Sequence, residues 1–227
     1  MQSLTLMLSK EIIGIIGGTG PEGQGLALRL GLAGFPIIIG SRNPEKGKAA
    51  IEKLSSIAPD LSLSCEDNSS TAEKSDIVII SVPFEAHQLT LEAIKTQLEG
   101  KIVINVVVPL TFKKGNAYPL LLPEGSAAVQ SQNLLPGSKI ISAFHNVAAP
   151  HLLKLSHSVD CDVIICGDDE QAKRKVCSIA EHIQGVKSID GGPLSNAQFS
   201  EQLTALLINL NKIYKSHTMI RFTGLPT

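Results

Sequence analysis

The sequence contains 227 residues, of which 43% are hydrophobic and 18% charged, and its formal net charge at pH 7 is −1. This length allows either one well-buried domain with a smaller unit attached or a single large domain, and no segment approaches the roughly 18 consecutive apolar residues of a membrane span. Because the charge is near neutral and no basic block is present, we expect small-molecule partners and neither nucleic acid nor a membrane.

The first ten residues and the cysteines bear on the cellular compartment. Residues 1–10 lack a basic n-region and a long apolar core, so we expect a short extension and no signal peptide. The four cysteines have neither CxxC nor zinc-ligand spacing; they are Cys65, Cys161, Cys166 and Cys177. We interpret them as reduced thiols of a cytoplasmic protein, and we expect no metal site.

A glycine-rich turn follows the first apolar segment, residues 11–16, and precedes an amphipathic stretch. Gly18, Gly20 and Gly23 match the GxGxxG fingerprint of dinucleotide-binding proteins. The first glycine is expected to allow the tight turn, the second to let a pyrophosphate approach the backbone, and the third to let helix and strand pack closely. The free N–H groups of the helix N-terminus favour bound phosphate, so this segment predicts a nucleotide site.

The end of the second predicted strand, residues 36–40, indicates which nucleotide binds. NAD-binding proteins usually place an Asp or Glu there, but this chain has Ser41 and Arg42, with Lys46 about one helical turn further on. A guanidinium matches the oxygens of a phosphate, and a lysine adds a point charge, so we predict NADP and its 2′-phosphate. The alternative is a solvated basic turn before a helix that Asn43 caps.

Apolar segments and amphipathic stretches alternate along the first two thirds of the chain. We expect further strands at 61–65, 76–83, 101–108 and 139–144, and helices at 45–58 and 86–98. Between the last two strands, residues 110–136 are expected to form a loop-rich crossover with a short helix at 127–134. Near-continuous apolar strands joined by helices predict a Rossmann-type, doubly wound parallel α/β sheet.

The pattern changes after Phe144. We expect a strand at 162–166, a helix that begins after Asp169 and ends at Gly185, a strand at 186–190 and a long last helix. Residues 195–198 have the pattern of a capping box that opens this last helix. The helix carries an apolar stripe that we interpret as core or dimer interface, formed by Leu203, Leu206, Leu207, Leu210 and Ile213.

Candidate binding groups follow the predicted strands, because ligands of open α/β sheets bind at the carboxyl ends of the strands. Val82 and Val108 offer the apolar surface that a nicotinamide ring needs, although valines there also suit a core. His145 directly follows the sixth predicted strand, where it either orients a substrate or is a structural histidine. No motif indicates a protein nucleophile, so no catalytic side chain is assigned.

Six short segments together carry a family resemblance. They are Gly17-Gly18-Thr19-Gly20, Gly40-Ser41-Arg42, Val82-Pro83, Phe144-His145-Asn146, Cys166-Gly167-Asp168-Asp169 and Gly192-Pro193-Leu194-Ser195-Asn196. In their order and spacing the chain resembles the coenzyme F420:NADP oxidoreductases over nearly all of its length beyond Lys10. The GDD and GPLSN segments are the most specific, since GGTG and GSR occur in other NADP reductases.

The resemblance implies hydride transfer between NADP(H) and the deazaflavin coenzyme F420, and it assigns residues by position. The pyrophosphate would lie against Gly18, Thr19, Gly20, Pro21 and Glu22. The 2′-phosphate would be held by Ser41, Arg42 and Lys46. Val82, Val108 and Ala149 would line the adenosine or nicotinamide, and His145 and Val147 would border the deazaflavin. With C4 of nicotinamide facing C5 of the deazaflavin, positioning supplies most of the catalysis.

On this basis residues 1–146 are expected to form an NADP-binding Rossmann domain and residues 147–227 a small C-terminal α/β domain that completes the deazaflavin cleft. We expect a homodimer formed through the C-terminal helices. Two alternatives remain: an NADPH-dependent reductase of another acceptor, such as a flavin, ferric iron or an imine, and a non-catalytic NADP sensor. Because a carboxylate facing phosphates is unfavourable, Glu22 is expected to point to solvent or to cap its helix.

Overall fold

The computed structural model describes residues 11–225, so the extension expected at residues 1–10 lies outside the described part of the chain. Its main feature is a sheet with strand order β10-β9-β8-β5-β4-β1-β2-β3. The strands are β1 (Ile13–Ile16), β2 (Ile37–Gly40), β3 (Leu63–Glu66), β4 (Ile77–Ile80), β5 (Ile102–Asn105), β8 (Lys139–Ser142), β9 (Cys161–Gly167) and β10 (Val186–Asp190). The six strands from β3 to β8 are parallel, whereas β9 runs antiparallel to β8 and pairs in parallel with β10. The predicted Rossmann-type α/β class is confirmed.

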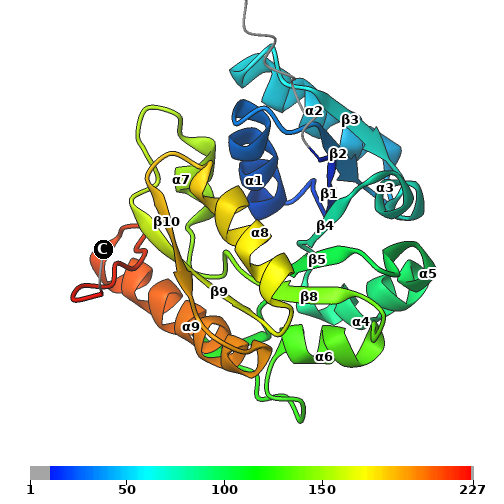
Figure 1. Cartoon of the computed structure of the whole chain (residues 1–227). Helices are drawn as coiled ribbons and strands as arrows, with labels where there is room; N and C mark the ends of the chain where they lie inside the picture. The colour runs from blue at the N-terminus through cyan, green and yellow to red at the C-terminus, as the bar shows by residue number, and fades with distance from the viewer. Residues whose placement is uncertain (1–10, 226–227) are drawn as a thin grey trace, which may run out of the picture.

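Helices cover both faces of this sheet because its strands are apolar on both faces. Ile13 and Ile15 pack with the helices of one face, while Ile16 points to the other face. The first face carries α1 (Pro21–Leu32), α2 (Pro44–Ile57), α7 (Ala149–Leu153) and α8 (Glu170–Glu181). The second carries α3 (Asn68–Lys74), α4 (Phe84–Ala93), α5 (Lys95–Leu98), α6 (Ala127–Leu134) and the start of α9 (Ala197–Tyr214). In Figure 1, α2 and β3 lie at one end of the molecule and α9 at the other.

Two helix starts follow the sequence signals closely. Asn43 caps α2, accepting a 3.1 Å hydrogen bond from the main-chain N–H of Lys46. Asp169 caps α8 in the same way, accepting from Ala172 at 2.8 Å.

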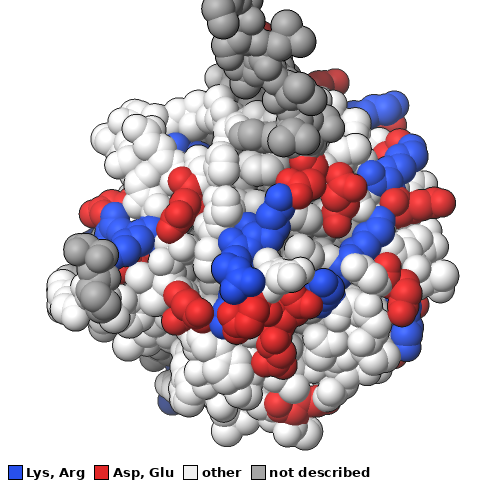
Figure 2. Space-filling view, viewed as in Figure 1, with Lys and Arg blue, Asp and Glu red and all other residues white. Residues whose placement is uncertain are grey.

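On the face of the molecule that carries α8, acidic and basic side chains interleave (Figure 2). None of the described helices is long and apolar enough to cross a bilayer.

The expected capping box at residues 195–198 is wrong. A 3₁₀ turn, Leu194–Asn196, precedes α9, and Asn196 makes no capping bond at its start. Its side-chain amide instead donates to the main-chain oxygen of Gly191 at 2.8 Å, which secures the loop after β10. The polar side chain therefore stabilises the approach to the helix and leaves the helix start uncapped.

Two segments differ in detail from the expected elements. The predicted helix at 86–98 is divided at Ile94 into α4 and α5. The crossover at 110–136 contains α6 with the expected bounds, and also a hairpin of β6 (Leu110–Lys113) and β7 (Asn116–Pro119) that was not expected. Asn209 of α9 anchors this hairpin by bonding both the N–H and the carbonyl of Ala117, at 2.8 and 2.9 Å.

Candidate functional site

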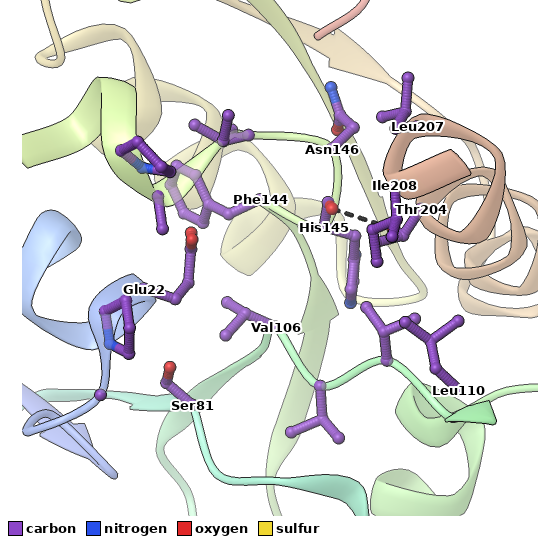
Figure 3. Close-up of a pocket in the computed structure, with 18 of the residues that line it drawn as sticks. Glu22, Ser81, Val106, Leu110, Phe144, His145, Asn146, Thr204, Leu207 and Ile208 are labelled. Carbon is purple, nitrogen blue, oxygen red and sulfur yellow. Dashed lines mark hydrogen bonds between the residues drawn. The ribbon is translucent and has the colours of Figure 1, made fainter. Parts of the chain in front are cut away.

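Two cavities meet at the carboxyl edge of the sheet, where the strand order reverses. The α2 cavity, of 670 Å³, lies between the turn after β1, the end of β2 and α2. The α9 cavity, of 480 Å³, lies between the start of α1, the segments after β5 and β8, and α9 (Figure 3). Both are lined by Gly20, Ser81, Val82 and Pro83. A ligand with two ends can therefore occupy both cavities by crossing at these residues.

The glycine turn between β1 and α1 is built as the fingerprint requires, with one difference. The left-handed residue is Gly17, with φ of 79°, so the tight turn depends on Gly17 and not on Gly18 as expected. A Cβ on Gly23 would lie 2.7 Å from the Cα of Gly18, which confirms the close packing predicted for the third glycine. A Cβ on Gly20 would have its nearest neighbour at 3.5 Å. The protein leaves that backbone open to a ligand.

Cations without a carboxylate partner line the α2 cavity. Arg42 and Lys46 are exposed there, and neither forms an ion pair with any described residue. Ser41 is buried beside them; its hydroxyl donates to the main-chain oxygen of Asn43 at 2.8 Å, which shapes the turn that carries Arg42. Two unpaired cations at the end of β2 make this cavity suited to an anion of the size of a phosphate.

A third cation extends this positive lining towards the glycine turn. Lys53 lines the α2 cavity, and its ammonium group donates to the side-chain oxygen of Gln24 at 2.8 Å. Gln24 in turn donates to the main-chain oxygen of Thr19 at 2.6 Å. Neither residue was predicted from the sequence, although Lys53 follows Lys46 by two helical turns and therefore lies on the same face of α2.

The lining of the α9 cavity is mainly apolar. It includes eight residues predicted for the cofactors, namely Gly20, Pro21, Glu22, Val82, Val108, His145, Val147 and Ala149. Thr204, Leu207, Asn211 and His217, which were not predicted, line it from α9 and the segment that follows. The spacing of Thr204, Leu207 and Asn211 places them on one face of α9, which could have indicated this lining. The leucines of the same helix were instead interpreted as core or dimer interface.

A strained turn presents His145 to this cavity. Phe144 is fully buried and has φ of 67°, a conformation that an aromatic residue rarely adopts. The turn is held from two sides, since Asn146 donates to the main-chain oxygen of Asp162 at 2.6 Å and Thr204 donates to that of His145 at 2.9 Å (Figure 3).

The imidazole of His145 is buried, and neither of its ring nitrogens makes a hydrogen bond of ordinary geometry, although the main chain of Val107 lies close to the ring. Burial lowers the pKa of His145 to about 4, so the ring is neutral at pH 7. A buried polar ring without partners is costly unless a ligand or water completes its hydrogen bonds. His145 lines the α9 cavity, and a ligand or water that reached its ring nitrogens would complete their hydrogen bonds.

Glu22 contradicts the expectation that it points to solvent or caps α1. Gly20 is the N-cap residue of α1, and no side chain caps this helix. The Glu22 side chain enters the α9 cavity and points towards Phe144 (Figure 3). Its Oε1 is buried without a hydrogen-bond partner, and burial raises the pKa of Glu22 to about 8. The neutral acid is therefore the main form at pH 7, which removes the conflict with a nearby phosphate.

Comparison with known proteins places the chain in a family. Residues 12–109 match the family model described as NADP oxidoreductase, coenzyme F420-dependent. The F420-dependent NADP reductase of Methanocaldococcus jannaschii is 43% identical over 94% of this chain and 98% of its own length. The chain belongs to the F420-dependent NADP oxidoreductase family. A second relative, the F420-dependent NADP reductase of Methanothermobacter marburgensis, is 40% identical over 94% of this chain and 99% of its own length.

The fold of this F420-dependent NADP oxidoreductase family member agrees with a solved structure. A protein of Arthrobacter sp. FB24 superposes with a TM-score of 0.79 over 93% of this chain and 99% of its own, at 22% identity.

Of the residues predicted for cofactor binding, only Gly18 lies in neither cavity, because it is packed beneath the turn against β1. The remaining predicted residues line one or both cavities, and Pro21 and Glu22 line the α9 cavity only.

Proposed function

We propose that this protein transfers a hydride between NADP(H) and coenzyme F420, with the nucleotide lying across both cavities. The observation that carries the proposal is the meeting of a cation-lined cavity with an apolar cavity at Val82 and Pro83. The two ends of a dinucleotide match these two cavities, since its phosphates are anionic and its nicotinamide ring is flat and largely apolar. Membership of the family supports the assignment of the second substrate.

The adenosine end of NADP occupies the α2 cavity in this proposal. Ser41, Arg42 and Lys46 bind the 2′-phosphate, because these two cations lack a protein carboxylate and the site offers none to a ribose hydroxyl. The pyrophosphate lies against Thr19 and Gly20, at the N-terminus of α1, where the open backbone fits a close approach. The residues present therefore fit NADP better than NAD.

The acceptor end occupies the α9 cavity. Val82, Val108 and Ala149 flank the nicotinamide, and His145 with Val147 borders the deazaflavin. Residues 147–227 act as the smaller unit that completes this cleft, while residues 1–146 bind NADP; the strands of the smaller unit continue the same sheet through the β8–β9 pair. The cofactors supply the hydride chemistry, and the chain supplies apolar walls that hold two rings face to face and exclude water.

The test is an assay of NADPH with oxidised F420, following loss of the deazaflavin absorbance, with FMN, ferric citrate and a cyclic imine as parallel acceptors. The proposal predicts rapid loss with NADPH, little with NADH, and much slower reaction with the other acceptors. Turnover of another acceptor in place of F420 would make the protein a different NADPH reductase. Tight NADPH binding without any turnover would indicate a sensor.

We also propose a cytoplasmic homodimer that associates through α9. One face of this helix carries exposed apolar side chains at helical spacing, with Phe199, Leu206 and Ile213 at 65%, 53% and 68% exposure. A second copy of the chain would cover this surface. The four cysteines are free, which fits a reducing compartment. Light scattering of the purified protein, compared with Leu206→Glu, distinguishes a dimer from a monomer.

A further inference from the structure

Glu22 is the acidic side chain among the described residues that line the α9 cavity, and the binding of NADP proposed above gives it no role. It lies in the first turn of α1, two residues after Gly20, which lines both cavities. Its side chain projects into the α9 cavity (Figure 3). It does not line the α2 cavity, which carries the cations. This direction takes the carboxyl group away from the phosphates and towards the end of the nucleotide that carries the reacting ring.

The surroundings of the carboxyl group are apolar, with Phe144 and Val106 near it across the cavity. Among the described residues that line this cavity, the other titratable side chains are His145 and His217. The lining from α1, from the segments after β4, β5 and β8, and from α9 contains no lysine or arginine. Burial without a cationic partner raises the pKa of Glu22 to about 8, and its Oε1 lacks a protein hydrogen bond.

A protonated carboxyl group has one O–H donor and one carbonyl acceptor side by side. A primary carboxamide has the complementary pair, a carbonyl acceptor and an N–H donor, so the two groups can form two hydrogen bonds at once. The nicotinamide end of NADP carries such a carboxamide. A carboxylate could accept the N–H, but it could not donate to the carbonyl, and it would remain buried without a counter-charge.

We propose that the Glu22 side chain binds the carboxamide of the nicotinamide through this pair of hydrogen bonds and so fixes the orientation of the ring. Glu22 is a specificity-determining contact for the nicotinamide end, and the inference rests on the proposed binding of NADP across both cavities. The position in the first turn of α1 suits this role, because the ring follows the pyrophosphate directly in the nucleotide and the pyrophosphate lies at the same helix end.

The test measures binding alone. The dissociation constants of NADPH, of its 3-acetylpyridine analogue and of 2′-phospho-ADP-ribose are determined at pH 7 for wild type, Glu22→Gln and Glu22→Leu. The analogue replaces the amide N–H₂ with a methyl group, and 2′-phospho-ADP-ribose lacks the nicotinamide. Glutamine keeps a donor and an acceptor at the same place, whereas leucine keeps only the bulk; thermal unfolding of each variant checks the fold.

We expect Glu22→Leu to weaken NADPH binding about tenfold, the effect of two neutral hydrogen bonds, and Glu22→Gln to weaken it less than about threefold. Both variants should bind 2′-phospho-ADP-ribose as wild type does. The analogue should bind wild type more weakly than NADPH does, and this difference should disappear in Glu22→Leu.

A pH series from 7 to 9.5 gives a second readout. As Glu22 ionises, the wild-type dissociation constant of NADPH should rise about tenfold, while that of Glu22→Gln should change less than about twofold. His145 and His217 are present in both proteins, so their contribution cancels in the comparison. The series begins above the range in which the 2′-phosphate titrates.

Three results would overturn the assignment. Unchanged NADPH binding in Glu22→Leu would show that the side chain makes no contact with the ring, and equal losses for NADPH and 2′-phospho-ADP-ribose would give Glu22 a structural role in the turn. Weaker binding of F420 with unchanged NADPH would place Glu22 against the acceptor. If wild type itself failed to bind NADPH, the proposed function would be wrong. The measurements on wild type therefore separate an error in the proposed function from an error in the role proposed for Glu22.

Discussion

The hydroxyl of Thr204 donates a 2.9 Å hydrogen bond to the main-chain oxygen of His145, which links α9 to the turn after β8 (Figure 3). The turn contains Phe144 in a left-handed conformation, so it depends on such contacts to keep its shape. The two residues are 59 positions apart in sequence. The contact therefore connects the C-terminal helix to the main chain of a residue that lines the α9 cavity.

Thr204→Val should weaken the acceptor site and leave the nucleotide site intact. The substitution keeps the shape and removes the hydrogen bond to His145, so we expect a loss of about 1 kcal/mol in stability and a several-fold rise in KM for F420. Kinetics at saturating NADPH and urea unfolding measure the two effects. Thr204→Ser, which keeps the hydroxyl, serves as the control. A rise in the NADPH dissociation constant without a change in the F420 KM would contradict this assignment.

His145→Ala should affect the acceptor more than NADPH. The substitution removes a buried neutral ring whose nitrogens make no hydrogen bond of ordinary geometry within the protein, so the loss falls on whichever ligand completes their hydrogen bonds. We expect KM for F420 to rise about tenfold, with NADPH binding within twofold of wild type. Steady-state kinetics with each substrate varied in turn gives both values. A selective loss of NADPH affinity would argue against the proposed contact between His145 and the deazaflavin.

Arg42→Ala tests the 2′-phosphate site. The guanidinium has no protein carboxylate, so its removal leaves no unpaired acid behind and the loss reports on the ligand. We expect NADPH binding to weaken by about 1.5–3 kcal/mol, the range for hydrogen bonds to charged groups, while weak NADH binding barely changes. Titration calorimetry with both nucleotides makes the comparison. Equal losses for NADPH and NADH would show that Arg42 does not contact the 2′-phosphate.

Arg29→Ala should destabilise the segment that carries Ala149. The buried guanidinium donates to four main-chain oxygens at the end of α7, at distances of 2.8 to 3.0 Å, namely those of His151, Leu152, Lys154 and His157. Alanine leaves these acceptors unpaired, so we expect a loss of about 3 kcal/mol in the free energy of unfolding. Arg29→Lys should retain part of the stability that these hydrogen bonds contribute. Urea unfolding decides, and a loss below about 1 kcal/mol would contradict the role assigned to Arg29.

Glu201 should give the stability a pH dependence. Its carboxyl oxygens accept hydrogen bonds from the N–H groups of Ala127 and Ala128, at 2.8 and 3.0 Å, and tie α9 to the start of α6. Burial outweighs these bonds and raises the pKa of Glu201 from 4.5 to about 7. The native protein therefore binds more protons than the unfolded chain, so this contribution is complete below pH 4.5 and is lost as the pH rises through 7.

The measurement is urea unfolding between pH 4.5 and 7.5 for wild type and Glu201→Gln. Across this range we expect wild type to lose about 3 kcal/mol relative to the variant, which is the shift in pKa expressed as free energy. Other titrating groups, Glu22 included, are shared and cancel. If the free energy of unfolding changed with pH in the same way in both proteins, Glu201 would ionise in the folded protein as readily as in the unfolded chain.

The parts of the fold that sequence analysis predicts depend on neighbouring residues. The cap at Asn43 acts on Lys46 within the same turn, and the cap at Asp169 acts on Ala172. Likewise, Arg42 comes two positions after the end of β2, and Lys46 comes four positions after Arg42. In each case the residues that decide the structure lie within a few positions of one another, so a local pattern is sufficient.

The parts that were missed depend on distant contacts. The β6–β7 hairpin has short, partly exposed strands, and Asn209 anchors it from 92 positions away along the chain. Glu22 was expected to point to solvent or to cap its helix because of its charge, but it is half-buried and faces a cavity that Phe144 and Val106 line from other parts of the sheet edge. Which of two adjacent glycines takes the left-handed conformation also depends on packing, here that of Gly17 against Ser81.

The most direct test of the account is a single-turnover experiment with NADPH deuterated at C4, in each of its two stereoisomers. Oxidised F420 is the acceptor, and mass spectrometry detects the label in the product. If the cleft holds C4 of nicotinamide against C5 of the deazaflavin, one stereoisomer should transfer its deuterium completely to F420, without exchange with water, and the other should transfer none. Absence of label in reduced F420 from both stereoisomers, or absence of F420 reduction, would contradict the account.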